Sequence, residues 1–254
     1  MSKLSAVIIT LNEEENIGRC IDSVKELADE VVVVDSLSTD RTKEIALSKN
    51  AKFIERAFTN YIDQKNFALT QASNNYVLNL DADECLSEEL QKNIHSAKEA
   101  GFTSDAYSMN RLNFYCDKPI KTCGWYPDKK IRLWNKTKGK WEGELVHEKL
   151  VMSAGSSVAH LKGDILHYSY PTHQSLIKQS ERFAELAARE LKKQPLIFLL
   201  FKLSFSSRFK FIRNYFFKLG FTDGSAGLEI CLCQSREVFI KYFRAIELKR
   251  NTGK

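Results

Sequence analysis

Two aspartates separated by one residue, Asp81 and Asp83, follow the apolar segment 76–80. This arrangement suits a divalent ion that bridges a diphosphate, because Mg²⁺ and Mn²⁺ prefer oxygen ligands and can take most of them from phosphate and water. The apolar segments 4–10 and 30–35 are also followed by polar side chains. Ligands of open α/β sheets bind beyond the carboxyl ends of the strands, so we expect the three exits to form one rim. An isolated Asp-x-Asp pair is common by chance, and the segment Asp35-Ser36-x-Ser38 is equally typical of a turn with a helix cap.

The elements that must position these groups can be read from the apolar periodicity. In the first hundred residues, strands are expected at 4–10, 30–35, 51–55 and 76–80, and helices at 14–27, 40–48, 61–72 and 87–100, with Asp40 and Ser87 as N-caps. This alternation predicts a parallel sheet covered by helices on both faces, a nucleotide-binding type of α/β fold. Further strands are expected at 105–115, 130–134, 148–152 and 163–169. They are followed by a helix at 172–193, a second helical region that runs from beyond Pro195 to about residue 219, and a third helix at about 228–248.

Composition excludes several classes of protein. The 254 residues are 43% hydrophobic, with 11 glycines and 4 prolines, which excludes collagen-like and linker-rich chains. The glycine-rich motifs of dinucleotide-binding folds and P-loops are missing. Six scattered cysteines without paired Cys-x-x-Cys motifs indicate reduced thiols rather than a zinc site. The N-terminus lacks a signal-peptide pattern and no segment of about 18 residues is apolar throughout, so we expect a cytoplasmic protein without a spanning helix.

Three segments in this order resemble family 2 glycosyltransferases of the GT-A fold: 6–14 (AVIITLNEE), 35–40 (DSLSTD) and 78–83 (LNLDAD). Segments 61–68 (YIDQKNFA), 132–134 (RLW) and 143–148 (GELVHE) resemble the branch with lipopolysaccharide core β-1,4-glucosyltransferases. The resemblance implies an inverting, metal-dependent enzyme that transfers glucose or another hexose from a UDP-sugar to a saccharide of the lipopolysaccharide core or a related cell-surface glycan. It also implies a catalytic domain over residues 1–170, with a donor-nucleotide half (1–100) and an acceptor half (101–170), and a helical region over 171–254.

The same resemblance implies roles for individual residues. Nucleotide-sugar contacts are expected from Thr10, Asn12, Glu14, Asp35, Ser38, Lys65, Asp81, Ala82 and Asp83. Mg²⁺ or Mn²⁺ is expected on Asp83, with Asp81 and His167 as further ligands, although a strand histidine bonded to backbone would fit the same pattern. The general base is expected to be Glu148, or else Glu144, unless both are surface acids. Acceptor contacts are expected from Trp125, Arg132 and Trp141, although aromatic residues near loops also serve as packing.

Charge divides the chain. Residues 1–100 carry 11 Lys and Arg against 18 Asp and Glu, whereas residues 101–254 carry 27 against 14. The segment 191–222 has seven basic residues and no acid. On a helical wheel, one face of this segment is an apolar stripe of Phe198, Phe201, Phe205, Phe209, Ile212 and Phe216. Lys202, Lys210 and Arg213 lie beside this stripe. This pattern predicts a helix that lies peripherally on the inner face of the cytoplasmic membrane. Packing against the catalytic domain or a second copy is the alternative.

Other functions fit parts of the sequence. A polyprenyl-phosphate sugar transferase can share the donor motifs, and a catalytically silent membrane-associated scaffold could keep the fold. Retention of Asp81, Asp83 and Glu148 together favours an enzyme. Nucleic acid is not an expected partner, because the first hundred residues are acidic and no nucleic-acid module is visible. The expected partners are a UDP-sugar, a lipid-linked or lipopolysaccharide-core saccharide, and the membrane surface.

Overall fold

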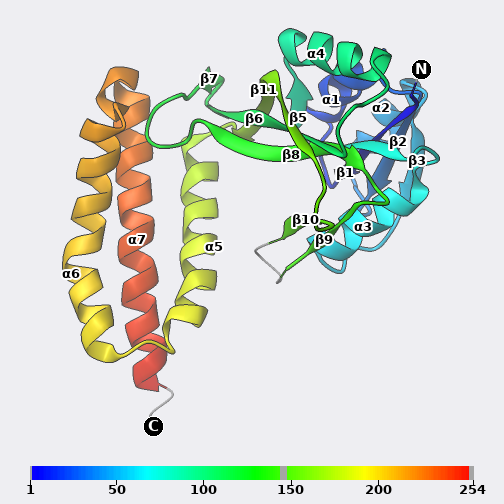
Figure 1. The fold of residues 1–254 in the computed structure, drawn as a ribbon. Coiled ribbons are helices and arrows are strands. Elements are labelled where there is room, and N and C mark those ends of the chain that lie inside the picture. The colour runs from blue at the N-terminus through cyan, green and yellow to red at the C-terminus, as the bar shows by residue number, and fades with distance from the viewer. Residues whose placement is uncertain (1, 144–147, 252–254) are drawn as a thin grey trace. The chain divides into compact units, whose positions relative to one another are not determined.

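The computed structural model describes residues 2–143 and 148–251. It contains two compact units (Figure 1). The first unit comprises Met1–Leu112 and Asp128–Tyr168, and the second comprises Asn113–Pro127 and Ser169–Lys254. The second unit therefore includes residues 113–127 in addition to the helical region expected from the sequence.

The main sheet begins as a parallel sheet and continues as an antiparallel one. Strands β3, β2, β1 and β4 are neighbours in this order and run parallel, as their β-branched sequences predict. They are β1 (Leu4–Thr10), β2 (Glu30–Asp35), β3 (Lys52–Glu55) and β4 (Tyr76–Asp81). Strand β8 pairs antiparallel with β4, and the order then continues through β6 and β11 to β5. The mostly parallel sheet expected from the first hundred residues is confirmed for β1 to β4, and beyond β4 the chain returns through strands without crossover helices.

The later strands include three that the sequence analysis missed. Strand β5 (Glu84–Leu86) has three residues, and β7 (Lys118–Pro119) has two. Strand β9 (Gly139–Glu142) pairs antiparallel with β10 (Lys149–Met152) in a separate two-stranded sheet. The remaining strands are β6 (Ala106–Tyr115), β8 (Asp128–Asn135) and β11 (Val158–Tyr170). Segments this short carry too little periodicity to be recognised from sequence.

Helices cover both faces of the parallel part of the sheet. They are α1 (Ile17–Val24), α2 (Thr42–Ser48), α3 (Tyr61–Gln71) and α4 (Glu88–Glu99). Ser87 caps α4 as expected, because its hydroxyl accepts a hydrogen bond from the Leu90 amide. Asp40 is not the N-cap of α2, which is Arg41, although its Oδ1 accepts a hydrogen bond from the Thr42 amide at 3.0 Å.

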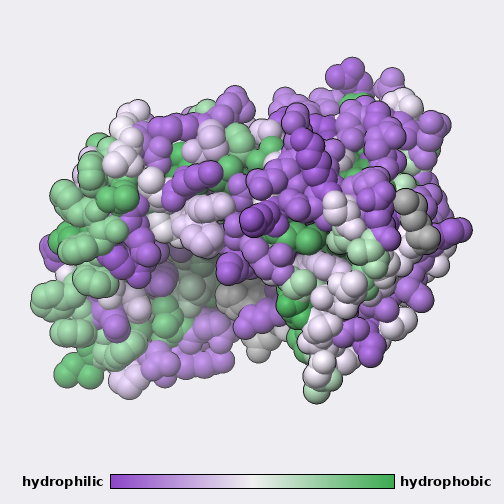
Figure 2. Space-filling view, turned by 45° about the horizontal axis from the view of Figure 1, so that its top comes forward, coloured by the Kyte–Doolittle hydropathy of each residue, from purple (hydrophilic) through white to green (hydrophobic). Residues whose placement is uncertain are grey.

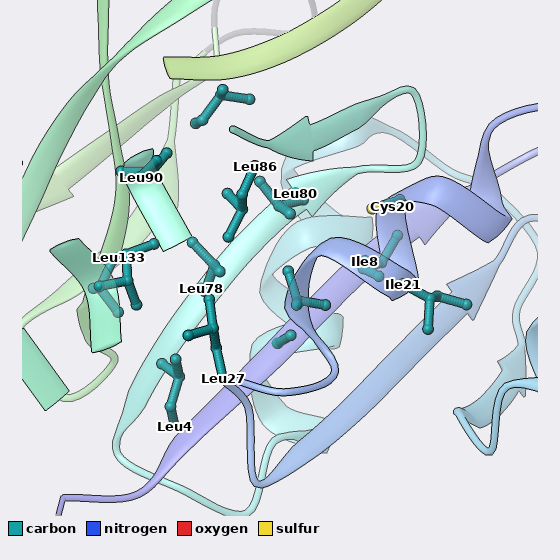
Figure 3. Close-up of a cluster of buried hydrophobic side chains, with 14 of the residues drawn as sticks. Leu4, Ile8, Cys20, Ile21, Leu27, Leu78, Leu80, Leu86, Leu90 and Leu133 are labelled. Carbon is teal, nitrogen blue, oxygen red and sulfur yellow. The ribbon is translucent and has the colours of Figure 1, made fainter. Parts of the chain in front are cut away.

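The alternation of side chains along β1 builds two hydrophobic layers. Leu4 and Ile8 point into the cluster that α1 and α4 cover, which contains Ile21 and Leu90 (Figure 3). The intervening residues, such as Val7, enter the opposite layer, which α3 covers. Burial on both faces explains why β1 is apolar at nearly every position, and it fixes the register that brings the strand ends together.

The second unit is mainly helical. It contains α5 (His173–Leu191), α6 (Leu196–Ile212), a π-helical turn (Arg213–Phe217), a short 3₁₀ helix (Gly220–Asp223) and α7 (Ser225–Asn251). Helix α7 packs against both α5 and α6. A Cβ atom on Gly227 would lie 1.8 Å from the carbonyl oxygen of Gly220, so glycine is required where α7 passes this turn. Across residues 2–143 and 148–251, none of the helices combines the length and apolar character needed to cross a membrane.

Candidate active site

The carboxyl ends of β1, β2 and β4 form one rim. Thr10 pairs in register with Asp35, and Ile9 pairs with Asp81. The ends of three adjacent parallel strands therefore place the Thr10, Asp35 and Asp81 positions next to one another, as expected from the polar residues at these exits.

Hydrogen bonds join the loops that follow β1 and β2. Asp35 is buried, and its two carboxylate oxygens accept hydrogen bonds from the Ser38 hydroxyl at 2.5 Å and the Ser38 amide at 2.7 Å. The Asn12 amide donates to Ser38 Oγ at 2.7 Å, and Asn12 Oδ1 accepts from the Thr39 amide at 2.8 Å. Thr10 Oγ1 is buried and has no hydrogen-bond partner within the part of the chain that the structure describes. This rim therefore combines a fixed carboxylate with an unsatisfied hydroxyl.

Two of the three glutamates after β1, Glu13 and Glu14, have different surroundings. The Glu14 carboxylate pairs with Arg41, whose Nε lies 3.2 Å from Glu14 Oε2. Glu13 was not singled out from the sequence, yet burial raises its pKa, and its electrostatic neighbours include Asp83 and His167. The only sequence signal for Glu13 is its place in a run of three glutamates, which does not distinguish among them.

Two cations hold Asp81. Lys65 Nζ lies 3.4 Å from Asp81 Oδ1, and Arg132 Nη2 lies 3.0 Å from Asp81 Oδ2. Burial by itself raises the pKa of Asp81, but the charges of Lys65 and Arg132 outweigh this effect and hold the pKa well below its usual range. Asp81 is therefore ionised and fixed in place.

Arg132 belongs to a buried ion-pair network. Its Nη2 lies 2.6 Å from Oε1 of Glu84, and their side chains are 4% and 0% exposed. Arg111 contacts the same Glu84 oxygen at 3.3 Å and also pairs with Asp128 at 2.8 Å. Sequence reasoning missed Glu84 and Arg111. The acceptor role of Arg132 stays a prediction, but its burial favours a role in positioning Asp81.

Lys65 connects Asp81 with the expected general base. Its ammonium lies 3.5 Å from Glu148 Oε1 and 4.6 Å from the centre of the Trp141 ring. Trp141 is buried, packs edge-to-face against Trp134, and bonds through its backbone to Asn66. Little of the Trp141 ring is open to a sugar, so its contact with Lys65 is the clearer role, and acceptor stacking stays a prediction.

Asp83 and His167 face each other across the rim. His167 Nε2 lies 3.1 Å from Asp83 Oδ2, and both side chains are partly exposed. Ala82 between the two aspartates is buried, and its amide donates to the Ile9 carbonyl at 3.1 Å. Within residues 2–143 and 148–251, no three His, Cys, Asp or Glu side chains converge to hold a metal ion. A carboxylate beside an imidazole still fits a cation that takes its other ligands from phosphate and water.

Two further site residues were expected from the sequence. Glu144 falls outside the described residues. Trp125 belongs to the second unit, where its ring lies 5.3 Å from that of Tyr170. Its acceptor role stays a prediction.

Comparisons with known proteins assign the chain to a family. Residues 5–149 match the sequence model of the family described as Glycosyl transferase family 2. The chain is 33% identical to an uncharacterized glycosyltransferase of Rickettsia typhi, over 98% of this chain and 89% of that protein. It is 30% identical to the lipopolysaccharide core biosynthesis glycosyltransferase LpsC of Rhizobium meliloti, over 84% of this chain and 80% of that protein. It also resembles the crystal structure of S. aureus TarS (residues 1–349), with a TM-score of 0.45 and 17% identity over 99% and 92% of the two chains.

Proposed function

Because the chain belongs to glycosyl transferase family 2 and has the GT-A fold, we propose that its rim binds a UDP-sugar and transfers the sugar to a saccharide acceptor with inversion. The observation that carries the proposal is the convergence of Lys65, Asp81 and Glu148. The buried Lys65 contacts both Asp81 and Glu148. A diphosphate that binds beside Lys65 would therefore lie close to Glu148, the expected base.

The nucleoside part of the donor fits the ends of β1 and β2. Asp35 is held by Ser38 with both carboxylate oxygens at defined positions, so it can accept hydrogen bonds from ribose hydroxyls or the uracil imide. The unsatisfied hydroxyl of Thr10 and the backbone beside Asn12 lie on the same rim. Lys65 supplies positive charge for the diphosphate.

Asp83 and His167, with Asp81, would hold Mg²⁺ or Mn²⁺. Their donor atoms are carboxylate oxygens and an imidazole nitrogen, and Asp83 already contacts His167. When bound, such an ion supplies positive charge that stabilises the departing diphosphate. These side chains would fill only part of its coordination shell, which leaves positions for phosphate oxygens and water.

Glu148 acts as the general base, with Glu144 as the second candidate. The acceptor hydroxyl gives its proton to the Glu148 carboxylate while its oxygen forms the new bond to the sugar's anomeric carbon. The bond from that carbon to the diphosphate breaks, and its electron pair leaves with UDP. Attack from the face opposite the leaving group inverts the anomeric configuration. The ammonium of Lys65 stabilises the carboxylate before transfer.

The acceptor is a lipid-linked or lipopolysaccharide-core saccharide at the inner face of the cytoplasmic membrane. The similarity to LpsC, which is named for lipopolysaccharide core biosynthesis, supports this substrate class. Glucose or another hexose is the sugar transferred. The exposed, basic α6 region supports a peripheral membrane location.

Thermal unfolding with and without UDP and Mn²⁺ tests the donor site. UDP at ~100 Kd should stabilise the native state by about 2.7 kcal/mol. We expect a stabilisation that depends on Mn²⁺ and is lost in Asp83→Asn. Asp117→Asn is the matched control, because Asp117 is exposed at a positive φ of 62°, which asparagine adopts readily. A chain that UDP does not stabilise, with or without Mn²⁺, would refute the proposed donor.

A further inference from the structure

A row of phenylalanines on α6 points away from the rest of the second unit. Phe201, Phe205 and Phe209 are 60%, 61% and 65% exposed. The opposite side of α6 faces α7, where Leu199 is buried and the Ser207 hydroxyl bonds to Ser235. At about 100° per residue, the exposed row lies roughly 180° from the packed side, so these rings take no part in the helical core.

The apolar surface continues beyond the end of α6. Phe216 and Phe217 in the π-helical turn are 54% and 78% exposed, and Leu219 and Phe221 follow with about half of their surface exposed. Figure 2 shows apolar residues gathered over this side of the second unit. A contiguous apolar surface of this extent marks an interaction site rather than a chance exposure.

Cations border the row on both sides. On the helical wheel Lys202 and Arg213 lie beside one edge and Arg208 lies beside the other, and Lys202 Nζ is 5.5 Å from the centre of the Phe198 ring. Lys210 was expected beside the row, but it is half-buried toward α7, and burial lowers its pKa. With no acid in residues 191–222, the charges that this segment itself places beside the row are all positive.

We propose that the α6 row (Phe201, Phe205 and Phe209) docks on a lipid bilayer that contains anionic headgroups. The rings enter the boundary between headgroups and acyl chains, and the bordering cations contact the headgroups. A second copy is a poorer occupant, because two identical faces would bring like charges together. This inference names the surface for the proposed membrane location and does not depend on the donor chemistry.

Vesicle sedimentation with the full chain tests this surface. We expect binding to vesicles of phosphatidylcholine with about a quarter of phosphatidylglycerol, whose headgroups are anionic, and weaker binding to phosphatidylcholine alone. Phe201→Ser/Phe205→Ser should weaken binding roughly tenfold or more, because two large apolar side chains are lost. Lys202→Gln/Arg208→Gln should weaken it roughly 20-fold on the anionic vesicles only.

Leu47→Ser/Phe183→Ser is the matched control, because both side chains are about half exposed and lie outside α6. This control and both α6 variants should keep the melting temperature and the UDP stabilisation of the parent chain, which separates failure of the membrane surface from failure of the donor site. The proposal is overturned if neither vesicle binds, or if the phenylalanine variant binds like the parent. A dimer in light scattering that the phenylalanine variant dissociates, without vesicle binding, would assign the face to a second copy instead.

Discussion

Replacing Arg132 with methionine removes a cation that pairs with the buried Glu84 and with the partly exposed Asp81. Arg132 Nη2 lies 2.6 Å from Glu84 and 3.0 Å from Asp81, and Glu84 is completely buried. Methionine keeps much of the aliphatic stem but leaves Arg111, at 3.3 Å, as the one cation paired with Glu84 among the described residues, beside the hydrogen bond that the Asp81 amide donates to Glu84 Oε2 at 3.1 Å.

Removal of one partner from a buried ion pair costs about 3–5 kcal/mol, because the other charge is left uncompensated. Since Arg111 still contacts Glu84, we expect the lower end of this range, about 3 kcal/mol. For a chain of this size each kcal/mol lowers Tm by about 2–4 °C, so the expected fall in Tm is about 6–12 °C.

Tryptophan fluorescence can follow this unfolding, because Trp134 and Trp141 are both buried in the first unit. The matched control is Lys43→Met, which removes an exposed pair with Glu55 at 3.1 Å. Exposed pairs contribute at most about 1 kcal/mol, so the control should keep Tm within about 4 °C.

A double variant, Arg132→Met/Glu84→Gln, separates uncompensated charge from lost packing. Because glutamine carries no charge, the double variant should regain part of the Tm that Arg132→Met loses. A decrease in Tm of less than about 3 °C for Arg132→Met would refute the reasoning. A double variant no more stable than the single one would assign the loss to packing.

Three further predictions concern the site and its frame. Glu148→Gln should lower kcat by roughly 10²–10⁴-fold while the Kd for UDP stays within about threefold, and a smaller kcat loss than in Glu144→Gln would make Glu144 the base. Lys65→Met should weaken UDP binding roughly tenfold or more in calorimetry, since it removes a charge-assisted contact, and unchanged affinity would exclude Lys65 from the donor site. Gly163→Ala should lower Tm by about 4 °C or more beyond Gly155→Ala, because both glycines have positive φ but only a Cβ at 163 would lie 2.4 Å from backbone. Equal losses would show that the α4 backbone moves aside.

The strand-end rim could be predicted from sequence, because each part of the signal is local. Apolar β-branched strands followed at once by Thr10, Asp35 and Asp81 determine both the parallel pairing and the edge at which these residues meet. The pairing of Asp83 with His167 needed more information, since 84 residues separate them, and came from the family resemblance.

The buried network around Glu84 could not be predicted in this way. Glu84 begins a three-residue strand that directly follows Asp83, so the sequence reads as a continuation of the acidic loop. Its partners Arg111 and Arg132 are 27 and 48 residues away in the sequence. They lie on antiparallel strands that no crossover helix connects, so the sequence does not indicate which strands are neighbours. Only the pairing of β8 with β4 and β6 makes these charges neighbours.

The charge balance of this network bears on the donor that the site can accept. Among the described residues, four cations face four carboxylates in the connected ion pairs: Lys65, Arg111, Lys130 and Arg132 against Asp81, Glu84, Asp128 and Glu148. Asp83 adds a fifth carboxylate at the rim, beside His167. The cations of the network are therefore already matched by its carboxylates, so a diphosphate brought to this rim would find no surplus positive charge in these ion pairs. A divalent cation held by Asp83 would supply positive charge that the ion pairs lack, which is why the UDP stabilisation is expected to depend on Mn²⁺ rather than merely to increase with it.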